Sequence, residues 1–345
     1  MAKIRRRNIS PRSRQKIEKK DLLNFFLVLV LMTLAVSLVM FGISIWERNR
    51  YATPGGESNV YIEPVIRQPK RVTVDGVDYV QKMEIETYYL MGIDVDEDYT
   101  GVYGGQNDVN LLLVIDNDAK TWRILQLNRD SMVDVQVIND TGSIVGTQYQ
   151  QLALAHSYGS GGRDSCLNAM DTVRALLWDQ PIDGFAALQM DGIAVLNDAA
   201  GGVDVVIPEE YALLDDRYQA GEEVHLMGND AMKFIRRRSM TADDANLDRM
   251  ARQRTYLNSF VKQFANLTES DILKAYEDSY RYMVTSIGSG VMLKIADKAQ
   301  TYTELPLMTV EGTLSVPEVF VEYELDQDSL QQAILELFYE QEGKA

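Results

Sequence analysis

Hydrophobic residues follow two spacings along this chain, one typical of strands and one typical of helices. Short apolar runs predict strands at residues 88–93, 109–115, 122–127, 185–189 and 203–207. Apolar residues at three- and four-residue intervals predict helices at residues 164–178, 191–199, 231–238 and 246–265. The last third adds expected helices at 271–285, 289–301 and 326–341, and expected strands at 305–310 and 318–324. Because strands alternate with helices, we predict an α/β (mixed α+β) domain whose helices cover a central mixed β-sheet.

The residues before this domain have a different pattern. Residues 53–59 are rich in glycine and small polar side chains, as in a short linker. The dipeptide Asp75-Gly76 separates two stretches of alternating hydrophobic and polar residues, and so predicts the turn of a β-hairpin. We therefore expect residues 47–85 to form a linker and a hairpin, and residues 86–345 to form one folded domain.

One apolar run is long enough to cross a membrane. Residues 22–46 hold no charged side chain, and a helix of this length spans roughly 37 Å at about 1.5 Å per residue. Nine Lys and Arg residues precede the run, an asymmetry that keeps the N-terminus in the cytoplasm. We expect residues 1–21 to be a basic cytoplasmic tail and residues 22–46 to be one transmembrane helix, with everything after it extracytoplasmic. A cleaved signal peptide is the alternative, but the run is longer than usual and no small-residue cleavage motif follows.

Composition excludes several classes of function. One cysteine allows no intrachain disulfide, and two histidines without a Cys/His cluster argue against zinc. Beyond residue 50 the chain carries 23 Lys and Arg against 48 Asp and Glu, a net charge of −25. Such a domain does not suit nucleic acid, and the basic tail is too short for a DNA-reading fold.

Arginines nevertheless recur in this acidic domain. They include Arg129, the run Arg236-Arg237-Arg238, and a helical group of Arg249, Arg252 and Gln253. The planar guanidinium group matches phosphate oxygens two at a time. At about 100° per residue, the helical group falls within an arc of roughly 100° beside the apolar face. These residues predict a local phosphate clamp, although each arginine could instead pair with a surface carboxylate.

Carboxylates stand at the ends of neighbouring predicted strands. Asp94 follows strand 88–93 and Asp108 precedes strand 109–115, while Arg129 and Asp130 follow strand 122–127. Ligands in open sheets gather beyond strand ends, and two carboxylates there can share a hard cation such as Mg²⁺ or Mn²⁺. Capping and turn roles are the alternative for each carboxylate.

Taken in order, these motifs resemble the LytR-CpsA-Psr (LCP) family over residues 86–265. The motifs are Gly92-Ile93-Asp94, Asn107-Asp108, Asn128-Arg129-Asp130-Ser131, Ala155-His156-Ser157-Tyr158-Gly159, Ala199-Ala200-Gly201-Gly202-Val203-Asp204, Phe234-Ile235-Arg236-Arg237-Arg238 and Arg249-Met250-Ala251-Arg252-Gln253. No one of them is specific, but their order and spacing together are.

The resemblance implies an LCP-like fold and a single-pass membrane protein of Gram-positive cell-wall assembly. Its activity would be a phosphotransferase that moves a teichoic acid or capsule-like glycopolymer from a polyprenyl-pyrophosphate carrier to peptidoglycan. Asp94 and Asp108 would hold Mg²⁺, and the pyrophosphate-binding residues would be Arg129, Arg236, Arg238, Arg249 and Gln253. To these we add Arg252 as a further pyrophosphate ligand, from the helical arc. We expect Arg129, Asp130, Asp94 and Asp108 to form the catalytic group.

Three positions depart from the family's pattern. Asp96 stands where Arg is often found, Asn128 where Pro usually precedes the next Arg, and Asn246 where Asp is common. These departures leave open a non-catalytic protein that binds polyprenyl phosphate or the cell wall. A pyrophosphatase that acts on the same lipid carrier, with water as the acceptor, is a further alternative.

Overall fold

The computed structural model describes residues 60–94, 105–139, 143–159, 161–239, 245–317 and 320–343. The expected cytoplasmic tail, transmembrane helix 22–46 and linker 53–59 lie outside these ranges, and so does Asp96. Within the ranges, no helix is both long enough and apolar enough to cross a membrane.

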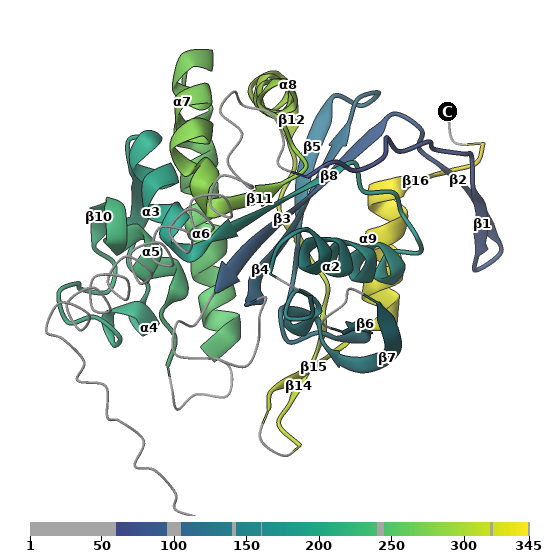
Figure 1. Ribbon diagram of the computed structural model, residues 1–345, viewed down its shortest axis with the longest axis horizontal. Helices are drawn as coiled ribbons and strands as arrows, with labels where there is room; N and C mark the ends of the chain where they lie inside the picture. The colour runs from purple at the N-terminus through teal and green to yellow at the C-terminus, as the bar shows by residue number, and fades with distance from the viewer. Residues whose placement is uncertain are drawn as a thin grey trace, which may run out of the picture. The chain divides into compact units, whose positions relative to one another are not determined.

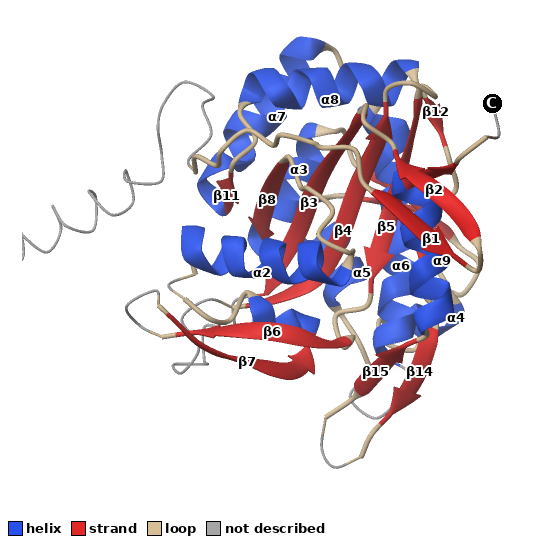
Figure 2. Ribbon diagram, turned by 90° about the vertical axis from the view of Figure 1, so that its right-hand side faces the viewer, coloured by secondary structure: helices blue, strands red, loops and turns tan. Residues whose placement is uncertain are grey.

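Seven strands in the described residues form one mixed sheet. Their order is β11 (Met283–Thr285), β8 (Gly184–Gln189), β3 (Ile85–Asp94), β4 (Gln106–Asp116), β5 (Thr121–Leu127) and β12 (Thr303–Glu304), with β13 (Met308–Thr309) also paired to β5. Strand β3 runs parallel to β8, and β5 runs parallel to β12 and β13, whereas the other pairs are antiparallel. Figure 2 shows β8, β3, β4 and β5 side by side. The predicted central mixed sheet is confirmed.

Strand direction brings the chemically important strand ends together. Because β4 is antiparallel to both of its neighbours, its first residues lie beside the last residues of β3 and β5. Strand β8 ends at the same place, since it is parallel to β3. We call this end of the sheet the site edge.

A β-bulge interrupts the β3–β4 pairing at the site edge. Gly92 pairs with Val109, whereas Ile93 pairs with Asn107, so Asp108 is the extra residue without a partner. A bulge re-aims the side chain of the unpaired residue. Gly92 is required beside it, because a Cβ atom there would lie 2.8 Å from Cγ2 of Val109.

Helices cover both faces of the sheet, as the sequence predicts. On one face, α2 (Arg163–Leu176) and α9 (Gln327–Phe338) pack against alternate strand residues such as Tyr89, Leu112 and Leu125. On the other face, α6 (Ala245–Phe264) and α8 (Ser289–Thr301) pack against the residues in between. Figure 1 shows the sheet between these two groups of helices.

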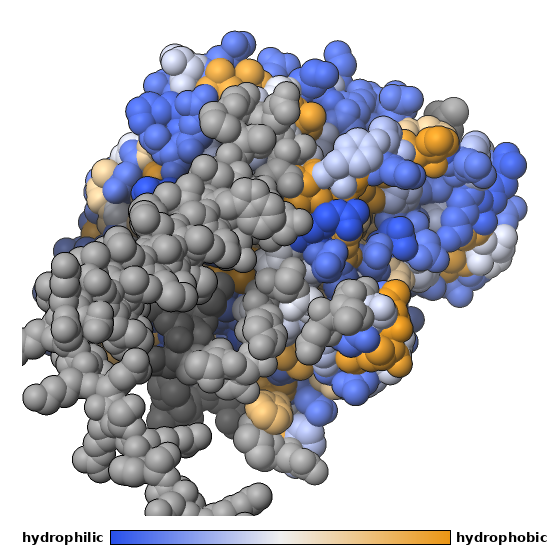
Figure 3. All heavy atoms as spheres, in the orientation of Figure 1, coloured by the Kyte–Doolittle hydropathy of each residue, from blue (hydrophilic) through white to orange (hydrophobic). Residues whose placement is uncertain are grey.

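A smaller core adjoins α6. It contains α3 (Met190–Ala199), the hairpin of β9 (Val203–Val206) and β10 (Glu223–Leu226), α4 (Glu209–Ala212) and α5 (Gly228–Arg236). The helix α7 (Glu269–Ser279) packs on α3. Two further hairpins are β6 (Met132–Ile138) with β7 (Ile144–Gln151), and β14 (Gly312–Ser315) with β15 (Glu322–Leu325). Hydrophobic side chains gather over the β6–β7 hairpin in Figure 3, where Ile144 and Val145 are exposed.

The predicted N-terminal hairpin forms, but it belongs to the folded domain. Strands β1 (Arg71–Val74) and β2 (Val77–Gln81) join through Asp75 and Gly76, which both have positive φ as a two-residue hairpin turn requires. Strand β16 (Tyr339–Gln341), close to the C-terminus, then pairs with β2. The folded domain therefore starts before residue 86, our predicted boundary.

Two predicted helices are shorter than expected. Helix α7 ends at Ser279, and after the short helix η2 (Tyr280–Tyr282) residues 283–285 form β11. Helix α9 ends at Phe338, after which the chain forms β16. In both places the strand exists because it pairs with a strand distant in sequence, and local spacing carries no information about that partner.

Candidate active site

Five buried side chains form a closed ring at the site edge. Asp108 comes from the bulge in β4, Arg129 and Asp130 from the loop after β5, and Asn246 and Arg249 from α6. Each of the five is at most 7% exposed. Three segments distant in sequence therefore meet at one point.

Asp108 joins the two arginines of the ring. Its Oδ1 atom lies 2.7 Å from Nη1 of Arg129, and its Oδ2 atom accepts a hydrogen bond of 2.7 Å from Nη1 of Arg249. The second Nη atom of Arg129 donates to the side chain of Gln106. The carboxylate is thus shared by the two guanidinium groups, with one oxygen for each.

Asn246 and Asp130 close the ring on the other side. Asn246 accepts a hydrogen bond of 2.8 Å from Nη2 of Arg249 and donates one of 2.7 Å to Oδ2 of Asp130. The Oδ1 atom of Asp130 lies 3.4 Å from Nε of Arg129, and it accepts a hydrogen bond of 3.1 Å from the side chain of Gln151. The ring therefore contains two carboxylates, two guanidinium groups and one neutral amide.

Burial changes the proton affinity of two ring members. Desolvation raises the pKa of Asp130, although the charges of Arg129 and Arg249 oppose the rise. Desolvation also lowers the pKa of Arg249, against the influence of Asp108. Both changes have the same cause, because low-dielectric surroundings disfavour the charged form of each group. Opposite charges keep such groups ionised only when they are in contact.

The run Arg236-Arg237-Arg238 begins at the last residue of α5 and does not act as one group. Arg236 donates two hydrogen bonds to the carboxylate of Asp94, at 2.7 and 3.1 Å. Arg238 is exposed, and no hydrogen bond or ion pair of its side chain is formed within the described residues. It lies close enough to the ring for its charge to lower the pKa of Asp130 and of Arg249.

Arg252, which we predicted to bind pyrophosphate, connects α6 to α5 instead. Its Nε atom donates to the carbonyl of Phe234 at 2.9 Å, and its Nη2 atom donates to the carbonyl of Arg237. Its Nη1 atom lies 3.3 Å from Glu210. Arg252 is rotated about 60° from Arg249 around the helix, which is enough to point it away from the ring. Arg249 and Arg252 therefore do not form one phosphate-binding surface, although they share the predicted helical arc.

Gln253, also on α6, is buried but forms hydrogen bonds to groups outside the ring. Its side chain donates a hydrogen bond of 3.3 Å to the carbonyl of Ile235 and accepts one of 3.4 Å from Gln126 of β5. The structure thus unites Asp108, Arg129, Asp130 and Arg249 of our predicted set. It puts Asp94 and Arg236 in a separate ion pair.

Of the two predicted metal ligands, Asp94 and Asp108, only Asp108 belongs to the ring. Asp94 and Asp108 offer the oxygen ligands that Mg²⁺ prefers. Each is already neutralised by guanidinium groups, however, and the described residues contain no group of three or more His, Cys, Asp or Glu arranged to hold a metal.

Sequence reasoning missed the amides that hold the ring. In the sequence, Asn246 stands out only as a departure from the family's pattern, and no role is predicted for Gln106 or Gln151. The three-residue spacing of Asn246 and Arg249 was the available signal, since such pairs share a helix face. Amides are common on helix faces, however, so this signal alone is weak.

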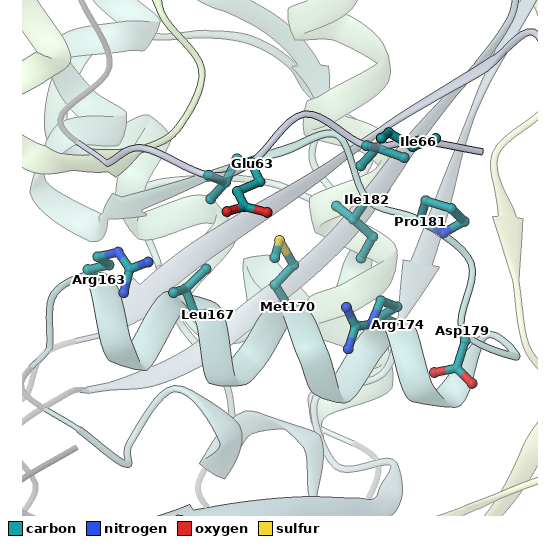
Figure 4. A pocket seen from close by; sticks show the side chains of 11 residues that line it. Glu63, Ile66, Arg163, Leu167, Met170, Arg174, Asp179, Pro181 and Ile182 are labelled. Carbon is teal, nitrogen blue, oxygen red and sulfur yellow. The ribbon is translucent and has the colours of Figure 1, made fainter. Parts of the chain in front are cut away.

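A cavity of about 450 Å³ lies between α2 and residues 62–66 (Figure 4). Its lining combines apolar side chains with charged groups near both ends of α2: Ile62, Glu63, Val65, Ile66, Arg163, Leu167, Met170, Arg174, Asp179, Pro181 and Ile182. The loop before α2 contacts Gly105 at the site edge, because Ser157 donates to its carbonyl and His156 lies 3.2 Å from it. The Arg163 end of the cavity therefore faces the site edge.

A model of the LytR_cpsA_psr family matches residues 58–338. The chain belongs to the LytR-CpsA-Psr family. It is 26% identical over 257 residues to the polyisoprenyl-teichoic acid–peptidoglycan teichoic acid transferase TagU of Halalkalibacterium halodurans, covering 73% of this chain and 77% of that protein. It is 28% identical over 231 residues to TagU of Enterococcus faecalis, covering 65% of this chain and 69% of that protein.

Solved structures of the family share the fold of this chain. B. subtilis TagV has a TM-score of 0.59 at 23% identity, over 74% of this chain and 96% of that one. The family protein YwtF (TagT), solved with bound octaprenyl pyrophosphate lipid, has a TM-score of 0.53 at 19% identity, over 74% of this chain and 90% of that one. The predicted family and its helix-covered mixed sheet are confirmed.

The contacts of Arg252 predict a loss of stability when it is replaced. Arg252→Leu should lower the free energy of unfolding by about 2–4 kcal/mol, because three acceptors lose their donor in or near the core. Urea unfolding measures this change. The exposed Lys262→Leu on the same helix is the control and should change stability by less than about 0.5 kcal/mol. Unchanged stability combined with weaker pyrophosphate binding would instead restore Arg252 as a ligand.

Proposed function

We propose that this chain is a membrane-tethered, extracytoplasmic phosphotransferase. It moves a glycopolymer, such as a teichoic acid or a capsule-like chain, from a polyprenyl-pyrophosphate carrier to peptidoglycan. The buried ring of arginines and carboxylates is the observation that carries this proposal. The transferase names of the TagU relatives and the lipid pyrophosphate bound to TagT support it. The tether rests on the apolar run at residues 22–46.

The arginines of the ring suit a pyrophosphate. The Nε atoms of Arg129 and Arg249 are buried and donate no hydrogen bond within the described residues, although Nε of Arg129 lies 3.4 Å from Oδ1 of Asp130. Phosphate oxygens would replace the carboxylates as partners of both guanidinium groups, and Arg238 would add a third positive charge. Positioning and charge neutralisation provide most of the catalysis in phosphoryl transfer.

In the proposed reaction, a hydroxyl oxygen of peptidoglycan bonds to the phosphorus that carries the glycopolymer. The bond from that phosphorus to the bridging oxygen breaks, and polyprenyl monophosphate leaves with the bridging oxygen. We assign the hydroxyl proton to Asp130, because burial raises the pKa of this ring carboxylate. Arg129 lies against Asp130 and holds the phosphate next to it.

Asp94 and Asp108 are the residues that would hold Mg²⁺, or Mn²⁺, in this proposal. A divalent cation supplies charge neutralisation on the phosphate oxygens. Phosphate oxygens that bind the arginines would release both carboxylates from their present ion pairs.

The cavity along α2 is our proposed site for part of the isoprenoid chain. Its lining from Ile62, Met170 and Ile182 suits hydrocarbon, and its Arg163 end faces the site edge. Met170→Trp should therefore fill the cavity and weaken polyprenyl phosphate binding by about tenfold, while inorganic pyrophosphate binds as before. The control is Leu213→Trp at an exposed position. Equal lipid affinity in both variants would place the chain elsewhere.

Transfer from a lipid-pyrophosphate glycan to a peptidoglycan oligomer tests the function directly. Arg129→Lys should lower turnover by about 10²-fold, because lysine keeps the charge but loses the two-pronged geometry. Donor affinity should fall much less, since Arg249 and Arg238 remain. The exposed Arg71→Lys serves as the control. Wild-type turnover in Arg129→Lys would remove this residue from the chemistry.

The same assay separates the alternative functions. A wild-type protein that binds the donor but transfers to no wall acceptor would be a binding protein. Cleavage of the donor with water as the only acceptor would indicate a pyrophosphatase.

The metal proposal predicts opposite effects with and without Mg²⁺. Asp94→Asn and Asp108→Asn should each abolish most of the gain in pyrophosphate affinity that Mg²⁺ gives, because an amide cannot balance the cation's charge. Without Mg²⁺, Asp108→Asn should bind pyrophosphate at least as tightly as wild type, since a competing carboxylate is gone. Calorimetric titration measures both affinities, with the exposed Asp118→Asn as control. A full Mg²⁺ response in both variants would exclude these ligands.

A further inference from the structure

Asn246 is the single neutral side chain in the ring, and its hydrogen-bonding groups point at three partners. Its Oδ1 atom accepts from Arg249 at 2.8 Å. Its Nδ2 atom donates to Asp130 and to Asn128, both at 2.7 Å. Both N–H groups of the amide are therefore used, and both go to the loop after β5.

Asn128 extends this connection to the backbone of the loop. Its Oδ1 atom accepts a hydrogen bond from Asn246 and a second one, of 2.9 Å, from the backbone N–H of Asp130. The amide of Asn246 therefore holds the carboxylate of Asp130 directly and its backbone through Asn128. Asn128 and Asn246, which depart separately from the family's pattern in the sequence, are in contact in the fold.

We infer that Asn246 is a positioning residue that sets the geometry between Arg249 and Asp130, with Asn128 as its counterpart in the loop. This inference rests on the proposed function and deepens it. An amide is suited to the place because it presents an acceptor to the guanidinium and donors to the carboxylate. A carboxylate at 246 would satisfy Arg249 but would face Asp130 with a like charge.

The neutral amide also sets the charge of the ring. Asp108 and Asp130 balance Arg129 and Arg249, so the ring as it stands has no net charge. A third carboxylate at position 246 would give the ring a formal net charge of −1 and would lie at hydrogen-bonding distance from the carboxylate of Asp130. Buried charges are tolerated when they are paired and hydrogen-bonded, a condition that this ring meets.

The test is the binding of geranyl pyrophosphate to the full-length protein in detergent, measured by calorimetry. Asn246→Leu is close in size and uncharged but cannot hydrogen-bond. It should weaken binding by about tenfold or more, since two charge-assisted hydrogen bonds that orient the ring are lost. Asn246→Asp keeps the acceptor for Arg249 and should also weaken binding. If only Asn246→Asp binds weakly, charge alone explains the effect and the positioning role is wrong.

Asn197→Leu is the matched control for a merely structural amide. Asn197 is fully buried, donates 3.1 Å to the carbonyl of Leu226 and accepts 3.0 Å from Tyr256. It should lose stability as Asn246→Leu does, but bind the probe within about threefold of wild type. Equal loss of affinity in the two Leu variants would overturn the inference.

A double variant tests the pairing of the two asparagines. Asn128→Ala should weaken binding by about threefold, and adding it to Asn246→Leu should cause little further loss, because both act through Asp130. If the loss of affinity in the double variant equalled the product of the two single losses, the two asparagines would act independently, which would contradict the inference. If Asn246→Leu does not fold, Asn128→Ala alone decides, and wild-type affinity would count against it.

The outcomes also separate this inference from the proposed function. Wild-type protein that binds the probe without ever transferring a glycan would refute the transferase, and the binding data would still decide the role of Asn246. If Asn246→Leu transferred the glycan at the wild-type rate, the positioning role would be refuted and the proposed transferase function would stand. Absence of probe binding by wild type would refute both.

Discussion

Two guanidinium groups remain charged inside this domain because carboxylates meet them at hydrogen-bonding distance. Removing ions from water is costly, and only close, well-directed partners offset that cost. Asp108 supplies one oxygen to Arg129 and the other to Arg249, and Asn246 and Asp130 complete the ring. Because its members come from β4, the loop after β5 and α6, the ring fixes these segments relative to each other. A pyrophosphate would meet arginines that are already oriented, and preorganised charge is the main source of catalysis in phosphoryl transfer.

The sheet provides the frame for this ring. Antiparallel pairing of β4 with both neighbours places the end of β3, the start of β4 and the end of β5 at one edge. The bulge opposite Gly92 then turns Asp108 out of the regular alternation. Helix α6 is attached to α5 through Arg252, which donates hydrogen bonds to two backbone carbonyls at the end of α5 and just after it. One arginine of the helix thus secures the position from which Arg249 acts.

The acidity of the domain gives the ring a particular role. In a strongly negative protein, an anionic lipid pyrophosphate needs a local site where positive charge is concentrated. Arg238 is exposed beside the ring, and Arg236 is paired with Asp94 at the end of β3. Arg238 therefore adds positive charge beside the ring, whereas Arg236 is neutralised by Asp94. The neutral Asn246 keeps a further carboxylate out of this place.

The sequence by itself determined most strands and helices, the family, and the positions of Asp108, Arg129 and Arg249, because hydrophobic spacing and short motifs are local properties. The sheet edge that joins them followed from strand order and direction, which local spacing does not contain. Arg249 and Arg252 lie on nearly the same helical arc, and only packing against α5 decided that Arg252 binds carbonyls while Asn246 joins the ring. Residues 283–285 and 339–341 became strands for the same reason. A strand, like a buried ion pair, exists only where a distant segment supplies its partner.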